Sequence, residues 1–312
     1  MNIFPYDSKI DFLRLRGIAL TVSAVLLLGA LALLATRGLN FALDFTGGTV
    51  AELKFEKPVD LDVVRDSLEK AGYEGAIVQA FGSETDVVVR LKPQSGQSNA
   101  EQTGGAVLAA IATPDNPGHV ADSGFVGPQV GKELAYNGIL AVVFVVVGFV
   151  FYITFRFEWK FAVAAIVTTM FDVAVTTGLF AFTQKEFDLA VLAGVLSVMG
   201  YSINDKIVVF DRVRENFRSL HKISAADVLN RSVNQTLSRT IITSFVAFLT
   251  VLALYLYGGR SLEGMAAAQM FGIVLGTLSS IFLACPLLLR LGASKQDLLP
   301  KARDEAELAR RP

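Results

Sequence analysis

Residues 200–216 read GYSINDKIVVFDRVREN and complete an apolar segment that is long enough to cross a lipid bilayer. Asn204, Asp205 and Lys206 therefore lie inside a predicted membrane span. An ionisable side chain at the bilayer centre costs about 2.5–3.5 kcal/mol on insertion scales, so such groups usually face the interior of a helix bundle and mark a path for ions or protons. This stretch predicts an integral membrane protein with charged groups between its helices.

The composition supports a membrane protein and argues against several other classes. Hydrophobic residues make up 53% of the 312 residues and charged residues only 18%, and the mean hydropathy is +0.51. The net charge of −1, with no basic face, argues against nucleic acid as a partner. Cys285 is the one cysteine, and His119 and His221 lie outside the apolar spans. We therefore expect no metal or other cofactor, and carboxylates would carry any protons.

Six runs of mainly apolar residues are long enough to span a membrane, which takes about 20 residues of helix. The first run is longer than the apolar core of a cleaved signal sequence, so we expect it to be retained as an anchor. The predicted spans are 17–36, 134–155, 161–184, 189–210, 240–259 and 264–289.

Lysines and arginines in the short connecting segments predict the orientation in the membrane. The side that holds both termini carries 17 of them, whereas the opposite side carries two, Lys185 and Arg260. Positively charged segments stay in the cytoplasm. We therefore predict that residues 1–16 and 290–312 are cytoplasmic and that 37–133 forms an extracytoplasmic domain.

The segment 37–133 has the alternation of polar and apolar residues that is typical of a soluble α+β domain. Its first strand is followed by a helix that Asp60 caps and that ends at Gly72. The order β-α-β-β-α-β predicts a ferredoxin-like arrangement beside the six-helix, all-α membrane bundle. The predicted strands are 48–56, 77–81, 86–91 and 120–126, and the predicted helices are 60–70 and 98–112.

Two aspartates lie within the predicted spans. Asp172 is halfway along 161–184, where burial favours the protonated form of a carboxyl group. Asp205 lies about 8 Å from the cytoplasmic end of its span and shares a helix face with Tyr201 and Asn204. This polar face is the first candidate for a proton relay.

Arg239 directly precedes the span 240–259 and reaches the depth of Asp205 if that helix begins one or two turns earlier. A proton arriving on Asp205 would then break an ion pair with Arg239 and let the two helices shift, because arginine stays charged. A charge crossing the membrane releases about 2.3 kcal/mol per 100 mV, which is enough to bias such an equilibrium. The alternative is a static pair that fixes helix register, and both roles also remain open for Asp172.

Other charged residues near the fourth span favour structural roles. Lys206 points about 100° away from Asp205 around the helix, and its long side chain can carry the ammonium to the membrane surface, so we expect it to snorkel. Asp211 and Arg212 lie at the membrane border, where charge mainly sets topology.

Two further patterns predict helix contacts. Residues 224–235 form a short amphipathic helix along the cytoplasmic surface, in which Asn234 either bonds across helices or solvates a turn. Gly272, Gly276 and Ser280 recur every four residues in the last span, which predicts close approach of another helix through either a static or a sliding contact.

Four motifs follow one another along the chain: DFTGG (44–48), VGPQVGKEL (126–134), GYSINDKIVVFDRVREN (200–216) and NQTLSRT (234–240). Together they resemble the SecF family of the bacterial protein-export machinery, within the resistance-nodulation-division superfamily. The resemblance covers most of the chain. The motif residues include Asp44, Gly47, Gly48, Asp211 and Arg212.

The resemblance implies a six-helix subunit of the bacterial inner membrane, surrounded by membrane lipid, with the domain 37–133 in the periplasm. It also implies that this subunit works beside SecD and the SecYEG channel and uses proton flow to assist the late export of preproteins. It implies neither enzymatic activity nor an ATP site. By motif, the proton-coupling positions of the family fall on Asp205 and Arg239. Two positions depart from the family pattern: Lys206 replaces the usual small hydroxyl residue, and Phe171 precedes Asp172 where relatives often carry His.

Two other functions remain open from the sequence. A proton-coupled exporter of small molecules is expected to have a second homologous half and an aromatic-lined pocket in the outer domain, and this chain offers neither. A passive scaffold of the translocation channel would use the buried charges for structure alone. The sequence has no phosphate-binding loop, HExxH helix or GxSxG elbow, which argues against an ATPase, a metalloprotease and a serine hydrolase.

Overall fold

The computed structural model describes residues 10–73, 75–81, 83–91, 100–220 and 223–294. The chain forms two compact units, one of Met1–Asn40 with Val142–Pro312 and one of Phe41–Ala141. Six helices of the described part are long and apolar enough to cross a membrane, so the chain is a multi-pass membrane protein. Parts of the predicted cytoplasmic tails, 1–9 and 295–312, lie outside the described residues, as do positions 98 and 99 of the predicted helix 98–112.

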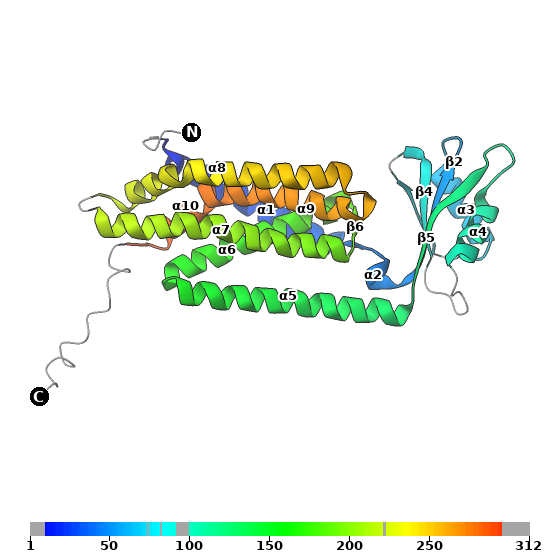
Figure 1. Cartoon of the computed structure of the whole chain (residues 1–312), viewed down its shortest axis with the longest axis horizontal. Helices are drawn as coiled ribbons and strands as arrows, with labels where there is room; N and C mark the ends of the chain where they lie inside the picture. Colours follow the sequence, from blue (N-terminus) through cyan, green and yellow to red (C-terminus); the bar gives the residue numbers. More distant parts are fainter. Residues whose placement is uncertain (1–9, 74, 82, 92–99, 221–222, 295–312) are drawn as a thin grey trace, which may run out of the picture. The chain divides into compact units, whose positions relative to one another are not determined.

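The membrane-spanning helices are long, and four of them begin or end well beyond the apolar runs that predicted them (Figure 1). A short 3₁₀ turn, η1 (Phe12–Leu15), precedes the first helix. The last span is interrupted by a π-helical turn, η2 (Ser280–Ala284), between two α-helices. The helices are α1 (Arg16–Thr36), α5 (Pro128–Arg156), α6 (Trp159–Thr183), α7 (Leu189–Ser219), α8 (Ala225–Tyr257), α9 (Arg260–Ser279) and α10 (Cys285–Arg290).

The predicted surface helix at 224–235 and the predicted span 240–259 are one continuous helix, α8. The separation was wrong because polarity does not end a helix, and no glycine or proline stands between Ala225 and Tyr257 to break it. Ser224 caps this helix by accepting a hydrogen bond from the Asp227 backbone.

Helix α7 likewise extends past the predicted end of its span at residue 210 and stops at Ser219. The Asp188 side chain caps its start by accepting from Val191 N at 2.6 Å. Its polar second half contains helix-forming residues and buries Val213 and Phe217, so packing continues where hydropathy falls.

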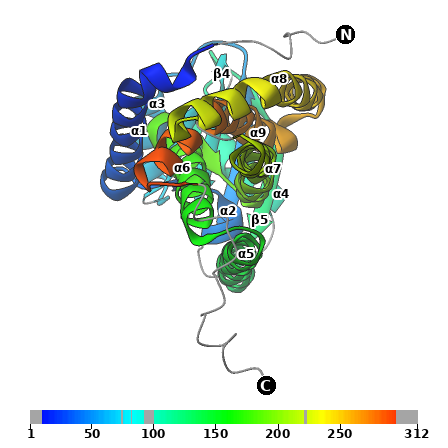
Figure 2. The same ribbon diagram turned by 90° about the vertical axis from the view of Figure 1, so that its left-hand side faces the viewer.

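Helices α6, α7 and α9 form the centre of the bundle. Buried residues make up 56% of the apolar window of α6, 44% of that of α7 and 61% of the window that runs through α9 and α10, but only 6–11% in α1, α5 and α8. Figure 2, which looks along the helices, places α6 between α1 and α7. The contact with α1 is close, because a Cβ at Gly178 would lie 2.5 Å from Ala30 Cβ.

The second unit contains a four-stranded antiparallel sheet in the order β3-β4-β2-β5. Alternate residues of the central strand β2, Ala51, Leu53 and Phe55, are buried in one core with side chains of two helices, α3 and α4. The strands are β2 (Gly48–Phe55), β3 (Ile77–Phe81), β4 (Ser83–Leu91) and β5 (Gly118–Val126), and the helices are α2 (Leu43–Thr46), α3 (Leu61–Lys70) and α4 (Ala100–Ile111). Two-residue strands, β1 (Asn40–Phe41) and β6 (Glu186–Phe187), complete the elements.

Candidate functional site

Helix α7 carries two polar faces that point toward different neighbours. Tyr201 and Asp205 lie one turn apart on one face, and Ser202 and Lys206 lie on the next face, about 100° around the helix. Asp205 is 3% exposed and Lys206 is fully buried. The first face contacts α8 and the second contacts α6 and α9, so the two adjacent charges have different surroundings.

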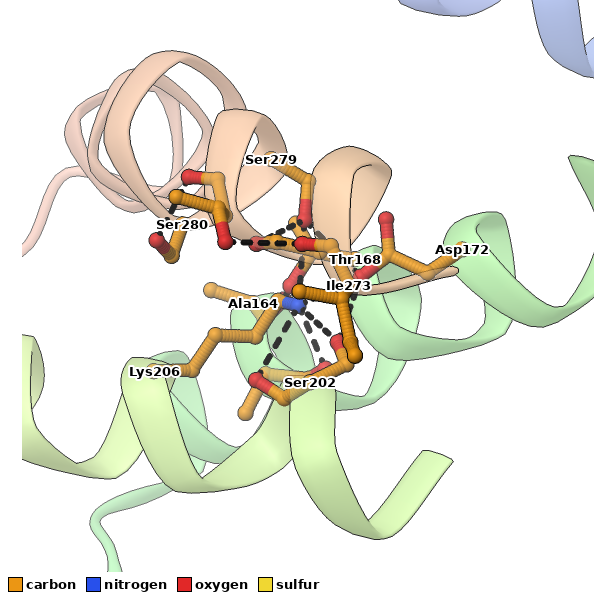
Figure 3. Close-up of polar contacts among 11 residues, drawn as sticks. Ala164, Thr168, Asp172, Ser202, Lys206, Ile273, Ser279 and Ser280 are labelled. Carbon is orange, nitrogen blue, oxygen red and sulfur yellow. Dashed lines mark hydrogen bonds and ion pairs between the residues drawn. The ribbon is translucent and has the colours of Figure 1, made fainter. Parts of the chain in front are cut away.

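The second face forms a buried ion pair within the bundle (Figure 3). Lys206 Nζ lies 2.7 Å from Asp172 Oδ2 on α6, and both side chains are fully buried. The Ser279 hydroxyl at the end of α9 donates to the same oxygen at 2.8 Å and accepts from Lys206 Nζ at 3.2 Å. The Ser202 hydroxyl bonds to both charged groups. We call these four side chains the charge clasp, since they join α6, α7 and α9.

The expectation that Lys206 snorkels to the membrane surface is wrong. Because α7 continues to Ser219, Lys206 lies about 20 Å from that end of its helix at 1.5 Å per residue. A carboxylate and two hydroxyls surround its ammonium instead and offset the cost of burying it. Asp172 is therefore not isolated in the bundle but forms an ion pair with Lys206. Its second oxygen, Oδ1, is buried without a hydrogen-bond partner in the described part of the chain.

Asp205 has the predicted burial but not the predicted partner. Its Oδ2 is buried and accepts no hydrogen bond from the residues that the structure describes. Arg239 on α8 is exposed and interacts with Asp205 electrostatically, yet among the described residues no N···O contact of 4.0 Å or less joins the two. Helix α8 begins at Ala225, so Arg239 lies within the helix as the prediction required, but its side chain is exposed. Asn204 is also exposed.

Neutral hydroxyl groups link the Asp205 face of α7 to α8 and α9. Tyr201 donates to Ser244 Oγ at 2.8 Å, and Ser244 Oγ lies 2.7 Å from Thr277 Oγ1. Sequence reasoning missed these groups because Ser and Thr in apolar helices commonly bond to their own backbone and so identify no site by themselves. The spacing of these residues in the sequence gives no signal, because it does not show which side chains of α7 they face. The missed residues are Ser202, Ser244, Thr277 and Ser279.

Glycines on α9 bring this helix close to α7. A Cβ at Gly272 would lie 2.2 Å from Val198 Cγ2, and a Cβ at Gly276 would lie 3.3 Å from Ser202 Cβ. Small residues allow this approach, which places α9 beside the charge clasp. Ser280 is buried and donates to a carbonyl of its own helix. Whether the contact is static or slides stays a prediction.

Asp211 and Arg212 lie near the C-terminal end of α7, away from the charge clasp. Asp211 Oδ2 accepts from Arg156 of α5 at 2.6 Å, and Arg212 pairs with Glu215 at 2.9 Å. These side chains are partly exposed, and such ion pairs contribute about 0–1 kcal/mol each. The contacts suit the structural role that the sequence favours for both residues.

The DFTGG motif forms a tight connection in the second unit. Asp44 lies in the first turn of α2, and Gly47 and Gly48 follow with φ of 65° and 122°, in the left-handed region. A Cβ at Gly48 would lie 2.3 Å from the backbone oxygen of Leu91, and one at Gly47 would lie 3.0 Å from Pro128 Cα. Glycine is therefore required at both positions by conformation and by space.

Replacing Gly48 by Ala is expected to destabilise the sheet by about 2–4 kcal/mol, because the left-handed conformation and the clash with Leu91 both oppose a Cβ. Hydrogen–deuterium exchange of the β2 and β4 amides in the full chain measures the effect. Gly105→Ala is the matched control, since Gly105 lies on α4 with no atom within 4 Å of an added Cβ. Equal exchange rates in the two variants would contradict the structural role of Gly48.

Two family models match the chain. The model described as protein export membrane protein SecD/SecF, C-terminal, matches residues 109–294. The model for the SecD/SecF GG motif matches residues 32–59, which include Gly47 and Gly48. The first match covers more than half of the chain and includes the whole charge clasp.

The family models cover both SecD and SecF, and individual relatives show which of the two subunits this chain resembles. The protein translocase subunit SecF of Pseudomonas aeruginosa is 44% identical over 301 residues, which cover 96% of this chain and 97% of that protein. The chain belongs to the SecF family. Another SecF-family member, the protein translocase subunit SecF of Escherichia coli O157:H7, is 41% identical over 290 residues, covering 93% of this chain and 90% of that protein.

A solved structure shares the fold of this SecF-family chain. The crystal structure of SecDF, a translocon-associated membrane protein from Thermus thermophilus, matches 92% of the chain with a TM-score of 0.80 and 34% identity. The chain spans 39% of the length of that SecDF chain.

Proposed function

We propose that this SecF-family chain is a subunit of the Sec protein translocase that couples the proton motive force to the late stage of preprotein export. The observation that carries the proposal is the buried Asp205 carboxyl, which stands in a family motif and has one oxygen without a hydrogen-bond partner in the described part of the chain. An uncompensated carboxylate is unfavourable in a buried site, so binding a proton stabilises it. Asp205 is the proton-binding group of the proposal.

Arg239 converts the protonation of Asp205 into movement in this proposal. It lies on α8, beside the helix of Asp205, and attracts the carboxylate without being bonded to it. Protonation removes that attraction, while hydrogen bonds between neutral groups, such as Tyr201 to Ser244, remain between the two helices. A proton that crosses the membrane supplies about 2.3 kcal/mol per 100 mV, which is enough to shift an equilibrium that is balanced within a few kcal/mol.

The second unit is a ferredoxin-like domain on the periplasmic side in this proposal, and both termini are cytoplasmic. The strand order β3-β4-β2-β5, with α3 and α4 as crossover helices, supports the ferredoxin-like assignment. The distribution of Lys and Arg in the short loops supports the orientation.

The proposed partners are SecD, the SecYEG channel and the preprotein in transit, within a lipid bilayer. Support for SecD comes from the crystal structure of SecDF, whose single chain includes a part with the fold of this chain. The outer faces of α1 and α5 are apolar and exposed, and lipid suits them. Protons are the coupling ion, and the proposal includes neither a bound cofactor nor an enzymatic reaction.

A passive scaffold of the translocation channel is the second candidate, because the charge clasp shows that one of the two buried acids has a structural partner. In a scaffold, Asp205 would also be structural. A small-molecule exporter has no specific observation in its favour.

Export driven by a membrane potential in inverted vesicles separates these functions. In vesicles that contain Asp205→Asn, we expect the increment of export that depends on the potential to fall at least 10-fold, with ATP-driven export unchanged, because asparagine cannot release a proton. Asp211→Asn is the matched control, since this aspartate lies on the same helix in a partly exposed ion pair. An undiminished increment in Asp205→Asn vesicles would support the scaffold.

A further inference from the structure

The charge clasp joins three helices at one buried point. Asp172 comes from α6, Ser202 and Lys206 from α7, and Ser279 from the last residue of α9. Asp172, Ser202 and Lys206 are 0% exposed, and Ser279 is 4% exposed. Every hydrogen bond within the clasp involves a charged group, and such bonds are shorter and stronger than bonds between neutral groups.

The packing around the clasp makes the same three helices a close unit. Gly272 and Gly276 let α9 approach α7 within contact of Val198 and Ser202. The α-helical geometry of α9 ends at Ser279, and the π-helical turn η2 follows directly. Such turns accompany functional sites in many helices. The clasp therefore fixes α9 at the point where its regular geometry changes.

Helix α8 is attached differently. In the described part of the chain, side-chain hydrogen bonds between α8 and α7 join Tyr201 to Ser244 and Asn216 to Ser232 and Gln235, and the Ser244 hydroxyl also interacts with the Asp205 carboxyl. The charged groups near Asp205 are Lys206 on its own helix and Arg239 on α8, and from α9 the neutral Thr277 reaches the same hydroxyl chain. A change of charge at Asp205 thus acts on α8 through Ser244 and Arg239, while the charge of Lys206 is already balanced by Asp172.

We propose that Asp172 and Lys206 are positioning residues, which fasten α6, α7 and α9 into one block so that a change of charge at Asp205 moves α8 against that block. The proposal rests on proton coupling at Asp205, the function proposed above. Without the clasp, the same change of charge would move α6, α7 and α9 relative to one another instead of moving α8. Protons would then still cross the membrane, but each proton would drive less preprotein export.

The test uses the whole chain, reconstituted into liposomes with its SecD partner and SecYEG, and compares Asp172→Asn/Lys206→Met with the parent. Proton flux is measured with a pH-sensitive dye inside the liposomes, and export is measured as the increment of preprotein translocation that depends on the proton gradient. We expect the double variant to keep at least half of the parent proton flux, while its export increment falls at least 5-fold. A double variant that keeps both the proton flux and the export increment, or loses both of them, would overturn the positioning role.

A milder variant covers the case in which too little of the double variant assembles. Ser279→Ala keeps both charges and removes only the bonds from α9, and we expect it to lower the ratio of export to proton flux several-fold. Thr154→Ala is its control, since among the described residues this exposed hydroxyl of α5 bonds only to a carbonyl of its own helix. An unchanged ratio in Ser279→Ala would overturn the proposal. A parent complex without proton flux would instead refute proton coupling itself.

Discussion

Replacing Lys206 by Met is expected to destabilise the membrane bundle by about 3–5 kcal/mol, because it leaves the Asp172 carboxylate buried without its counter-charge. Asp172→Asn leaves the ammonium unpaired and should have an effect of similar size. Unfolding of the purified chain in detergent, followed by circular dichroism against denaturant concentration, measures both. Each single change is therefore expected to behave as the loss of a core residue.

The double variant Asp172→Asn/Lys206→Met is the control for these single changes. It removes both charges and keeps side chains of similar length, so we expect it to cost less than about 1.5 kcal/mol, well below the sum of the single changes. A double variant that is as unstable as that sum would show that the two residues act independently. That result would contradict the ion pair.

Replacing Arg239 by Ala is expected to lower the potential-dependent increment of export at least 10-fold and yet to change the free energy of unfolding by less than about 0.5 kcal/mol, the range of ordinary surface substitutions. Arg239 is exposed, and within the described residues its guanidinium makes no ion pair, so the folded bundle hardly depends on it. Its proposed role is the attraction for Asp205. The two measurements are export in inverted vesicles and unfolding in detergent.

Arg231→Ala is the matched control for Arg239→Ala. Arg231 is exposed on the same helix, two turns nearer its start, and has the same charge. We expect export with this variant to stay close to that of the parent. Equal losses in the two variants would mean that α8 needs positive charge in general, and a large loss of stability in Arg239→Ala would mean that the arginine is structural.

Hydropathy and turn residues predicted the elements of the fold, because these signals are local. Each of the six spans corresponds to a helix of the structure, and the strands at 48–56 and 77–81 lie within one residue of β2 and β3. The bounds of α7 and α8 were missed, since their polar halves are stabilised by contacts with each other, such as Asn216 with Gln235, that hydropathy does not record.

Contacts between helices were harder to predict than the helices. Residue spacing placed Lys206 about 100° from Asp205, but it gives no information on which neighbour lies in that direction. The partner of Lys206 is Asp172, 34 positions earlier on another helix. For the same reason, depth alone suggested an ion pair between Asp205 and Arg239, whereas the structure places the arginine on the exposed side of α8.

The family resemblance and the burial argument selected the same residue, Asp205, by independent routes. The family motif identified the position of Asp205 in the sequence. The cost of burying an uncompensated carboxyl group in a helix bundle indicated that this residue binds a proton. The charge clasp came from the structure alone, because serines in membrane helices give no signal until their neighbours are known.

Proton flux through the reconstituted complex of this chain with SecD and SecYEG tests proton coupling at Asp205 most directly. Liposomes with a dye for internal pH and an imposed potential report the flux, and Asp205→Asn is compared with the parent at equal protein content. Coupling at Asp205 predicts flux in the parent and a rate at the level of empty liposomes in the variant. Flux in Asp205→Asn equal to that of the parent would contradict it.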